Sequence, residues 1–310
     1  MRALVTGATG FVGYHLAKTL LAMGYEVHIF TRNQSNRWRI RHLDGLVTEH
    51  RVDLCCFSDV EQAVLRIKPN VVGHCATYGG FSFQNHADSI IHTNLLGTMN
   101  LLRACEITGF QTFIHTGSSS EYGMKQQPMM ETDVLEPVSD YGVSKAAAAL
   151  YCRAQALRKN LPIVILRLFS PFGPWDDPAR MMSYVITSLL RKERPIITSP
   201  TSVRDYIHIE DVMKAYKLVI QSSITPGEIY NIGMGKQTSV KEIVAYIREI
   251  IGTTVDPIWA DAHTPLHEST TWTANINKAK HELLWLPTTS VYDGISDTVK
   301  WFEQQIRDDP

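Results

Sequence analysis

The most constraining feature of this chain is a run of glycines close to its start. An apolar strand candidate at residues 2–5 leads into Gly7-x-x-Gly10-x-x-Gly13, and residues 14–23 then show helical apolar spacing. A strand, a glycine turn and a helix in this order form a dinucleotide-binding context, because the helix N-terminus favours a diphosphate. We therefore expect a cofactor-binding loop lined by Gly7, Thr9, Gly10, Phe11, Val12 and Gly13.

Strand and helix candidates alternate through the first half of the chain. Strands are expected at 2–5, 26–30, 46–54, 71–75, 111–116 and 163–169, with helices at 59–67, 84–108 and 146–159. We expect Ser58 or Asp59 to cap the first of these helices. The alternation predicts an α/β fold, a Rossmann-type doubly wound parallel sheet. We assign residues 1–169 to this dinucleotide-binding domain. Residues 170–310, where the alternation breaks, are expected to form mainly a smaller discontinuous substrate lobe, with some segments returning to the sheet.

Residues at the carboxyl ends of the strands are the other candidate cofactor contacts, because such sheets bind ligands at that edge. The second strand is followed by Arg32 rather than by the acid that usually binds the ribose hydroxyls of NAD. Arg32 can meet a 2′-phosphate, with Arg37 in support, so NADP(H) is favoured and NAD(H) remains an alternative. Asp53 and Leu54 end the third strand, near the expected adenine, and Ala76 follows the fourth, where the ribose would pass.

A second group of residues predicts proton transfer. Serines 118, 119 and 120 cluster where the strand at 111–116 ends, and Tyr141 and Lys145 open an alanine-rich helical run. The i, i+4 spacing places the phenol and the ammonium on one helix face. An ammonium beside a phenol favours the phenolate, and a nearby serine hydroxyl can polarise an oxygen that exchanges a proton with it.

Composition excludes several classes of partner. The 30 basic and 31 acidic residues give a net charge of −1, so we expect no general attraction to nucleic acid or to an anionic membrane. The five cysteines lie in apolar contexts without metal-ligand spacing, which predicts no metal site and a reducing compartment. No apolar run approaches the ~20 residues of a membrane span. Because the sequence opens directly on a strand, we expect no signal peptide and a cytoplasmic location.

Several motifs together resemble a known family. They are Gly7-x-x-Gly10-x-x-Gly13, Asn94-x-x-Gly97-Thr98, the Ser118–Gly123 run, Tyr141-x-x-x-Lys145 and the segments 167–174 and 202–212. In this order they closely resemble the extended short-chain dehydrogenase/reductase family, in its branch of nucleotide-sugar epimerases, dehydratases and 4-ketoreductases. The resemblance covers nearly the whole chain.

The resemblance implies a role for each candidate residue. Tyr141 is the general acid/base, and Lys145 supports it and binds the nicotinamide ribose, so both also contact the cofactor. Ser118, four residues before Tyr122, is the hydroxyl that contacts the sugar oxygen, and Ser119 is its nearest rival. The further substrate contacts implied are Ser119, Ser120, Ser170 and Arg204, with Arg204 on the diphosphate of a nucleotide-sugar. The family also pairs helices like 84–108 and 141–159 between subunits, which implies a homodimer.

Three positions depart from the family pattern. The dehydratases carry an acid two residues before the equivalent of Tyr122, where this chain has Ser120, so dehydration is disfavoured. Ser170 replaces a common asparagine. A second diphosphate-binding arginine is missing near the C-terminus, and His263 or His267 is a candidate to take over part of its role.

These observations favour an enzyme that reduces an NDP-4-keto-6-deoxysugar at C4, with Tyr141 as the general acid. The alternative is an NDP-sugar C4 epimerase with a tightly bound cofactor. A non-catalytic cofactor-binding regulator is a third hypothesis, against which the presence of both Tyr141 and Lys145 counts. The nucleotide base, the sugar and the stereochemistry at C4 stay open.

Overall fold

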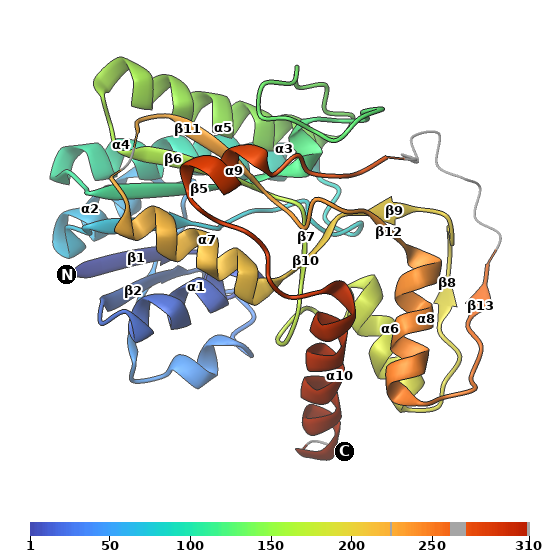
Figure 1. Cartoon of the computed structure of the whole chain (residues 1–310). Helices are drawn as coiled ribbons and strands as arrows, with labels where there is room; N and C mark the ends of the chain where they lie inside the picture. The colour runs from blue at the N-terminus through green and yellow to red at the C-terminus, as the bar shows by residue number, and fades with distance from the viewer. Residues whose placement is uncertain (224, 261–270, 309–310) are drawn as a thin grey trace.

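A seven-stranded, wholly parallel sheet forms the centre of the molecule, in the order β11-β6-β5-β4-β1-β2-β3 (Figure 1). The computed structural model of the chain describes residues 1–223, 225–260 and 271–308. The strands are β1 (Arg2–Thr6), β2 (Glu26–Thr31), β3 (Val47–Arg51), β4 (Val71–His74), β5 (Thr112–Ser118), β6 (Ile163–Leu168) and β11 (Glu228–Ile232). The strand order reverses at β1, between β2 and β4, which is where such sheets bind ligands. The expected Rossmann-type fold is confirmed.

Helices cover both faces of this sheet. On one face lie α1 (Phe11–Ala22), α7 (Ile209–Gln221) and α9 (Asn277–Glu282), and on the other lie α2 (Phe57–Ile67), α4 (Gly97–Thr108) and α5 (Asp140–Lys159). β5 and β6 are buried along their whole length, as expected for central strands of a doubly covered parallel sheet. Because α7, β11 and α9 follow residue 170, part of the second half of the chain returns to the sheet.

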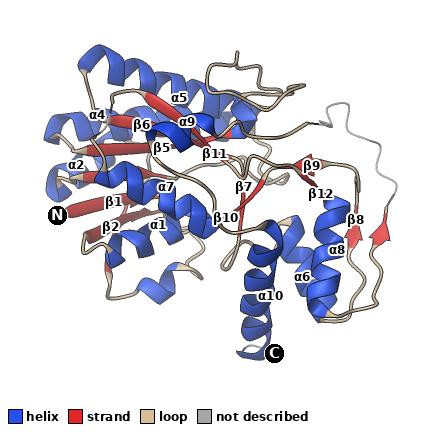
Figure 2. Ribbon diagram, viewed as in Figure 1, coloured by secondary structure: helices blue, strands red, loops and turns tan. Residues whose placement is uncertain are grey.

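The rest of the second half packs around a separate apolar core. Its helices are α6 (Met181–Leu190), α8 (Val240–Ile251) and α10 (Val291–Asp308), which bury side chains such as Val185, Ile243 and Ile295. Its short strands are β7 (Ser170–Phe172), β8 (Ile196–Ile197), β9 (Val203–Arg204), β10 (Tyr206–His208), β12 (Thr238–Ser239) and β13 (Ile258–Trp259). This group of helices and strands lies beyond the carboxyl ends of the main strands (Figure 2).

Three expectations about individual helices and strands were wrong. The single helix expected at 84–108 is interrupted: α3 (Ala87–Ile91) and α4 flank a π-helical segment, η2 (His92–Leu96). Helix α2 begins at Phe57 with Cys56 as its N-cap and no side-chain cap bond, so neither Ser58 nor Asp59 caps it. The third strand ends at Arg51, which leaves Asp53 and Leu54 in the loop that follows. The structure also contains two short 3₁₀ helices, η1 (Ile40–Leu43) and η3 (Ser119–Glu121).

The described part of the chain carries neither a membrane-spanning helix nor a metal cluster. None of its helices combines the length and the hydropathy needed to cross a membrane. Within the same residues, His, Cys, Asp and Glu side chains nowhere gather in threes that could hold a metal ion. All five cysteines are described, and each is a free thiol.

Candidate active site

The glycine turn between β1 and α1 is shaped by contacts that a side chain would block. Gly7 has φ +72°, and a Cβ there would lie 2.6 Å from the backbone nitrogen of Ala76. A Cβ on Gly13 would lie only 2.2 Å from the carbonyl oxygen of Gly7. Gly10 is the N-cap of α1 and supplies no side-chain cap, so first-turn N–H groups are left for a ligand. This cradle fits the diphosphate of a dinucleotide.

The remaining strand-end candidates lie on the same edge of the sheet. Ala76 follows β4 and touches the glycine turn, where its N–H donates to Thr6 Oγ1 at 3.3 Å. The Asp53 carboxylate accepts the N–H of Cys55 at 2.9 Å, which forms a local turn after β3. Leu54 is buried, and Gly97 of α4 packs directly against it. The structure thus gathers these residues around the carboxyl ends of β1, β3 and β4.

An acidic side chain that sequence reasoning missed lies beside the end of β2. Glu49, on the neighbouring strand β3, accepts the Thr31 hydroxyl at 2.5 Å and is ion-paired with Arg37. Burial raises the pKa of Glu49, but the hydrogen bonds from Arg37 and Thr31 outweigh it, so the net pKa is lowered. Arg37 is therefore engaged by Glu49 rather than supporting a phosphate site. Arg32 is exposed, and among the described residues its guanidinium has no hydrogen-bonding partner.

Arg39 fastens the glycine turn to the second half of the chain. It is almost completely buried and donates to the carbonyl oxygen of Thr9 at 3.1 Å and to that of Trp175 at 2.7 Å. Its guanidinium also lies 4.2 Å from the ring centre of Trp38, which stacks on Trp175. Sequence reasoning missed Arg39, because a polar run with four arginines between residues 32 and 41 gives no signal for which one is buried.

Helix α5 presents the candidate acid/base pair in its first turns. Ser139 caps the helix by accepting the N–H of Gly142 at 3.1 Å, so Tyr141 and Lys145 lie one turn apart. Lys145 is buried, and its ammonium donates to the Thr116 carbonyl oxygen of β5 at 2.5 Å. The Tyr141 ring lies against Gly79, where an added Cβ would come within 3.4 Å of it. The predicted pair is thus held at the carboxyl end of the central strand.

Asn94 explains the π-helical segment in the helix expected at 84–108. The extra residue of a π-bulge turns Asn94 inward, where it is buried. Its amide donates to the Tyr78 carbonyl oxygen and to Ser144 Oγ, both at 2.8 Å, and its carbonyl accepts the Tyr78 N–H at 2.8 Å. Asn94 therefore joins the loop after β4 to the helix of Tyr141. In the sequence, Asn94 belongs to the Asn-x-x-Gly-Thr motif, to which we assigned no role.

The three consecutive serines have different surroundings. Ser118 is the N-cap of η3: its Oγ accepts the Ser120 N–H at 3.1 Å, and its own N–H donates to Glu121 Oε1 at 2.7 Å. Ser119 Oγ accepts the indole N–H of Trp272 at 3.1 Å. Ser120 is half-buried, and its backbone packs so closely on the first turn of α5 that Gly142 has no room for a Cβ. Close packing of η3 on that turn brings the serines beside Tyr141.

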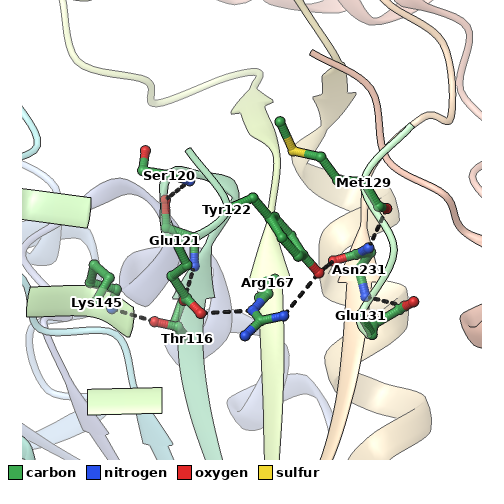
Figure 3. A network of polar contacts seen from close by, with 10 residues as sticks. Thr116, Ser120, Glu121, Tyr122, Met129, Glu131, Lys145, Arg167 and Asn231 are labelled. Carbon is green, nitrogen blue, oxygen red and sulfur yellow. Dashed lines mark hydrogen bonds and ion pairs between the residues drawn. The ribbon is translucent and has the colours of Figure 1, made fainter. Parts of the chain in front are cut away.

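Glu121 lies in a buried polar network that begins at the Ser118 N–H (Figure 3). Its carboxylate accepts Arg167 Nε–H at 2.7 Å, and Arg167 also donates to the Tyr122 hydroxyl at 2.9 Å. Tyr122 donates in turn to Asn231 Oδ1 at 2.7 Å. Burial lowers the pKa of Arg167, but Glu121 and Tyr122 more than offset it and the net pKa is raised. The network ties β5, β6 and β11 together and occupies the Glu121 carboxylate.

Two further candidates, Ser170 and Arg204, are brought together by the small sheets of the second half. β10 pairs with β7 so that Tyr206 lies opposite Ser170, and the Ser170 N–H donates to the Asp205 carbonyl oxygen at 2.9 Å. The Asp205 side chain is buried, and burial raises its pKa to about 7 against the hydrogen bonds that it accepts from backbone N–H groups. Arg204 and Ser170 are therefore neighbours in space despite their separation in sequence.

Arg204 is a cation without an acidic partner in the described part of the chain. Its Nη1 donates to the Val203 carbonyl oxygen at 2.6 Å and to Ser202 Oγ at 3.2 Å. A guanidinium held by neutral groups keeps its charge available for an anion. His263 and His267, proposed to replace a second arginine, lie outside the described residues.

Comparison with known proteins agrees with this geometry. The sequence model of the NAD dependent epimerase/dehydratase family matches residues 3–233, which is well over half of the chain. The protein belongs to this family. Relatives match nearly its whole length: an uncharacterized UDP-glucose epimerase, YtcB, of Bacillus subtilis is 32% identical over 97% of this chain and 98% of its own.

Solved structures of epimerase/dehydratase proteins superpose closely. A UDP-glucose 4-epimerase from Thermotoga maritima, crystallised with UDP-glucose, is 26% identical and covers 99% of this chain and 100% of its own at a TM-score of 0.92. A UDP-glucuronic acid 4-epimerase from Bacillus cereus, in complex with UDP-glucuronic acid and NAD, is 28% identical, with coverages of 98% and 100% and a TM-score of 0.88. The epimerase/dehydratase family of this chain thus includes structures that hold NAD beside a nucleotide-sugar.

Proposed function

We propose that this protein is an NAD-dependent C4 epimerase of a nucleotide-diphosphate sugar. The observation that carries this choice is the fastening of the glycine turn by Arg39, which bonds both Thr9 and Trp175. An epimerase regenerates its own cofactor and gains nothing by releasing it. A buried arginine that joins the cofactor loop to the other half of the chain supports retention. The complexes of related epimerases with NAD support the same cofactor.

The chain's own residues account for proton transfer at C4. Bound NAD supplies the acceptor and then the donor of hydride. Tyr141 takes the proton of the C4 hydroxyl as the sugar is oxidised, and returns it when C4 is reduced on its opposite face. The Ser118 hydroxyl donates to the same sugar oxygen and stabilises the negative charge that develops on it. Lys145, whose ammonium donates to the Thr116 carbonyl oxygen, follows Tyr141 by one helical turn on the same face of α5.

The hydrogen bonds that already engage the Glu121 carboxylate disfavour dehydration. A dehydratase must remove a proton from a sugar carbon with a carboxylate that faces the substrate. Glu121 instead lies in the buried network, where Arg167 and the Ser118 N–H occupy its oxygens. Ser120 stands where the resemblance would require the acid, and its hydroxyl is a poor base.

A second candidate, reduction of an NDP-4-keto-6-deoxysugar, is kept because of Arg32. This exposed guanidinium remains able to meet a 2′-phosphate, which would favour exchange with an NADPH pool. Its support is weaker than sequence reasoning suggested, because Arg37 is paired with Glu49. We therefore place the reductase after the epimerase.

The proposed substrate follows from the cation at Arg204 and from the relatives. Arg204 is suited to a diphosphate, and related structures contain UDP-glucose, UDP-glucuronic acid or dTDP. We propose that the sugar end lies at Ser118 and Tyr141, with Ser120 and Ser170 as further contacts. The nucleotide is then bound on the side of the second half of the chain.

We also propose a cytoplasmic homodimer. Three apolar side chains spaced by seven residues on α5 are exposed, namely Val143, Leu150 and Leu157, at 45%, 52% and 59%. Leu96 and Ile107 of the neighbouring helical segments are exposed as well. An apolar stripe of this kind supports helix pairing between two subunits. Five free cysteines suit the reducing conditions of the cytoplasm.

The proposed function is tested with the protein as purified. Its cofactor is released by denaturation and identified by chromatography, and the native protein is incubated with UDP-glucose, UDP-glucuronate or dTDP-glucose without added cofactor. We expect bound NAD and interconversion of at least one C4-epimeric pair. Stoichiometric oxidation of added NADPH by an NDP-4-keto-6-deoxysugar, without epimerisation, would establish the second candidate instead.

A further inference from the structure

The backbone at Trp272 and just after it is anchored by two side chains from other parts of the chain. Its N–H donates to Gln237 Oε1 at 3.0 Å, and two residues later the Ala274 N–H donates to the buried carboxylate of Asp205 at 2.9 Å. Ala274 also forms a parallel bridge with Met129. Because Asp205 directly follows Arg204, the same carboxylate fixes the segment of Trp272 relative to the diphosphate-binding candidate.

The indole of Trp272 touches two residues of the proposed site that are far apart in the sequence. Its Nε1–H donates to Ser119 Oγ at 3.1 Å, next to Ser118. The guanidinium carbon of Arg204 lies 5.1 Å from the centre of the Trp272 ring, within cation–π range. A single ring therefore spans from Ser119 to Arg204.

Each contact restricts the conformations of one side chain, Arg204 in one case and Ser119 in the other. A flexible arginine has many rotamers, and stacking on an aromatic face limits them without neutralising the charge. The hydroxyl of Ser119 accepts the indole N–H, so its own proton must point elsewhere. Neither role could be read from the sequence, where Trp272 follows a run of polar residues.

We propose that Trp272 is a positioning residue that sets the separation between the sugar end of the site and its diphosphate end. It does so by fixing Ser119 and Arg204 on one rigid ring, which restricts the nucleotide-sugars that can reach Ser118 and Tyr141 while bound at Arg204. This inference rests on the proposed function, because it takes Arg204 as the diphosphate contact.

The first measurement is nucleotide affinity, by titrating UDP and, separately, dTDP into the holoenzyme in a calorimeter. Trp272→Ala should weaken binding of the tighter nucleotide by roughly 3- to 30-fold, the range of a cation–π contact. Trp272→Phe keeps an aromatic face and should stay within about twofold of the wild type. Trp259→Phe, a partly exposed tryptophan of β13, is the matched control and should change nothing.

The second measurement separates KM from kcat for the epimerised sugar. Trp272→Phe should lower kcat by roughly three- to tenfold, the cost of one hydrogen bond, with KM nearly unchanged. Ser119→Ala should then cost no more in the Trp272→Phe background, since both changes break the same bond. If the two losses instead multiply, the link to Ser119 is wrong, even if Trp272→Ala fails to fold.

Arg204→Ala distinguishes failure of this inference from failure of the proposed function. If Arg204→Ala weakens nucleotide binding at least tenfold but Trp272→Ala leaves it unchanged, the positioning role of Trp272 is overturned alone. If Arg204→Ala leaves nucleotide affinity unchanged, or if the wild type binds neither nucleotide, the proposed diphosphate site is wrong. The inference about Trp272 is then wrong as well. Parallel losses in Arg204→Ala and Trp272→Ala support both.

Discussion

Arg167 donates to Glu121 across 2.7 Å in a site where both side chains are excluded from solvent. The pair also contacts the candidate catalytic residue Ser118, because Glu121 accepts the Ser118 N–H. A carboxylate that looks available in the sequence is thus part of the framework that orients the site.

Glu121→Gln should destabilise the fold strongly, because it leaves the charge of Arg167 buried without its partner. Loss of one member of a buried ion pair costs about 3–5 kcal/mol. Urea unfolding followed by circular dichroism measures this cost. The matched control is Glu303→Gln, whose exposed pairing with Arg307 should be worth at most about 1 kcal/mol.

A double variant checks that the cost arises from the pair. Glu121→Gln combined with Arg167→Met removes the stranded charge and should cost less than the sum of the two single changes. Additive losses would show that the two side chains stabilise the fold independently of each other.

Arg39→Met should release the cofactor faster. It removes two hydrogen bonds from a charged donor, to the carbonyl oxygens of Thr9 and Trp175. Even one such bond, at about 1.5 kcal/mol, corresponds to roughly a tenfold faster loss. The nicotinamide dinucleotide retained after timed dilution and desalting gives the rate. Arg41→Met, at an exposed position of the same segment, should leave retention unchanged, and equal rates in both variants would contradict the proposed fastening.

His15 should make the fold less stable in mild acid. Burial lowers its pKa to about 4 from about 6.5, so between these values the unfolded chain binds a proton that the folded chain does not. Stability from this group is complete above pH 6.5 and decreases as the pH falls toward 4, by about 3 kcal/mol in all.

His15→Gln removes that titration and keeps an N–H donor for the Pro174 carbonyl oxygen. Its stability should therefore decline less steeply than that of the wild type between pH 6.5 and 4. Urea unfolding at several pH values measures the slopes. His281→Gln, an exposed histidine of α9, serves as the control, and an unchanged slope in His15→Gln would contradict the assignment.

Leu150→Glu should disrupt the proposed dimer. A charge at the centre of the apolar stripe on α5 would have to be buried without a partner in a helix-paired interface. Light scattering after size exclusion should give a dimeric wild type and a monomeric variant. Leu46→Glu, at an exposed leucine away from α5, should remain dimeric. A monomeric wild type would remove the dimer proposal altogether.

Local signals predicted the fold and much of the candidate site. The three glycines of the first turn are required by contacts of 2–3 Å around Gly7 and Gly13, and such steric requirements are visible in the sequence. Tyr141 and Lys145 follow a helical period, which fixes their common face once the helix forms. Both signals depend on neighbours within a few residues.

The residues that sequence reasoning missed act through distant parts of the chain. Glu121 is buried because Arg167, 46 residues later, meets it from the next strand. Trp272 reaches Ser119 across 153 residues, and Arg39 reaches Trp175 across 136. No spacing rule predicts such pairs. The π-helical segment at Asn94 was missed for a related reason, since its burial depends on bonds to Tyr78 and Ser144.

The most direct test of the central claim is the fate of a label at C4. An NDP-sugar that the protein epimerises, deuterated at C4, is incubated with the purified protein alone, with Tyr141→Phe, and with Tyr151→Phe as a control tyrosine on the same helix. If the cofactor is retained and Tyr141 moves the proton, the C4 epimer keeps its deuterium in the wild type and in Tyr151→Phe. Turnover in Tyr141→Phe should fall ~10²–10⁴-fold. Appearance of deuterium in free nicotinamide cofactor, or near-normal turnover of Tyr141→Phe, would contradict the account.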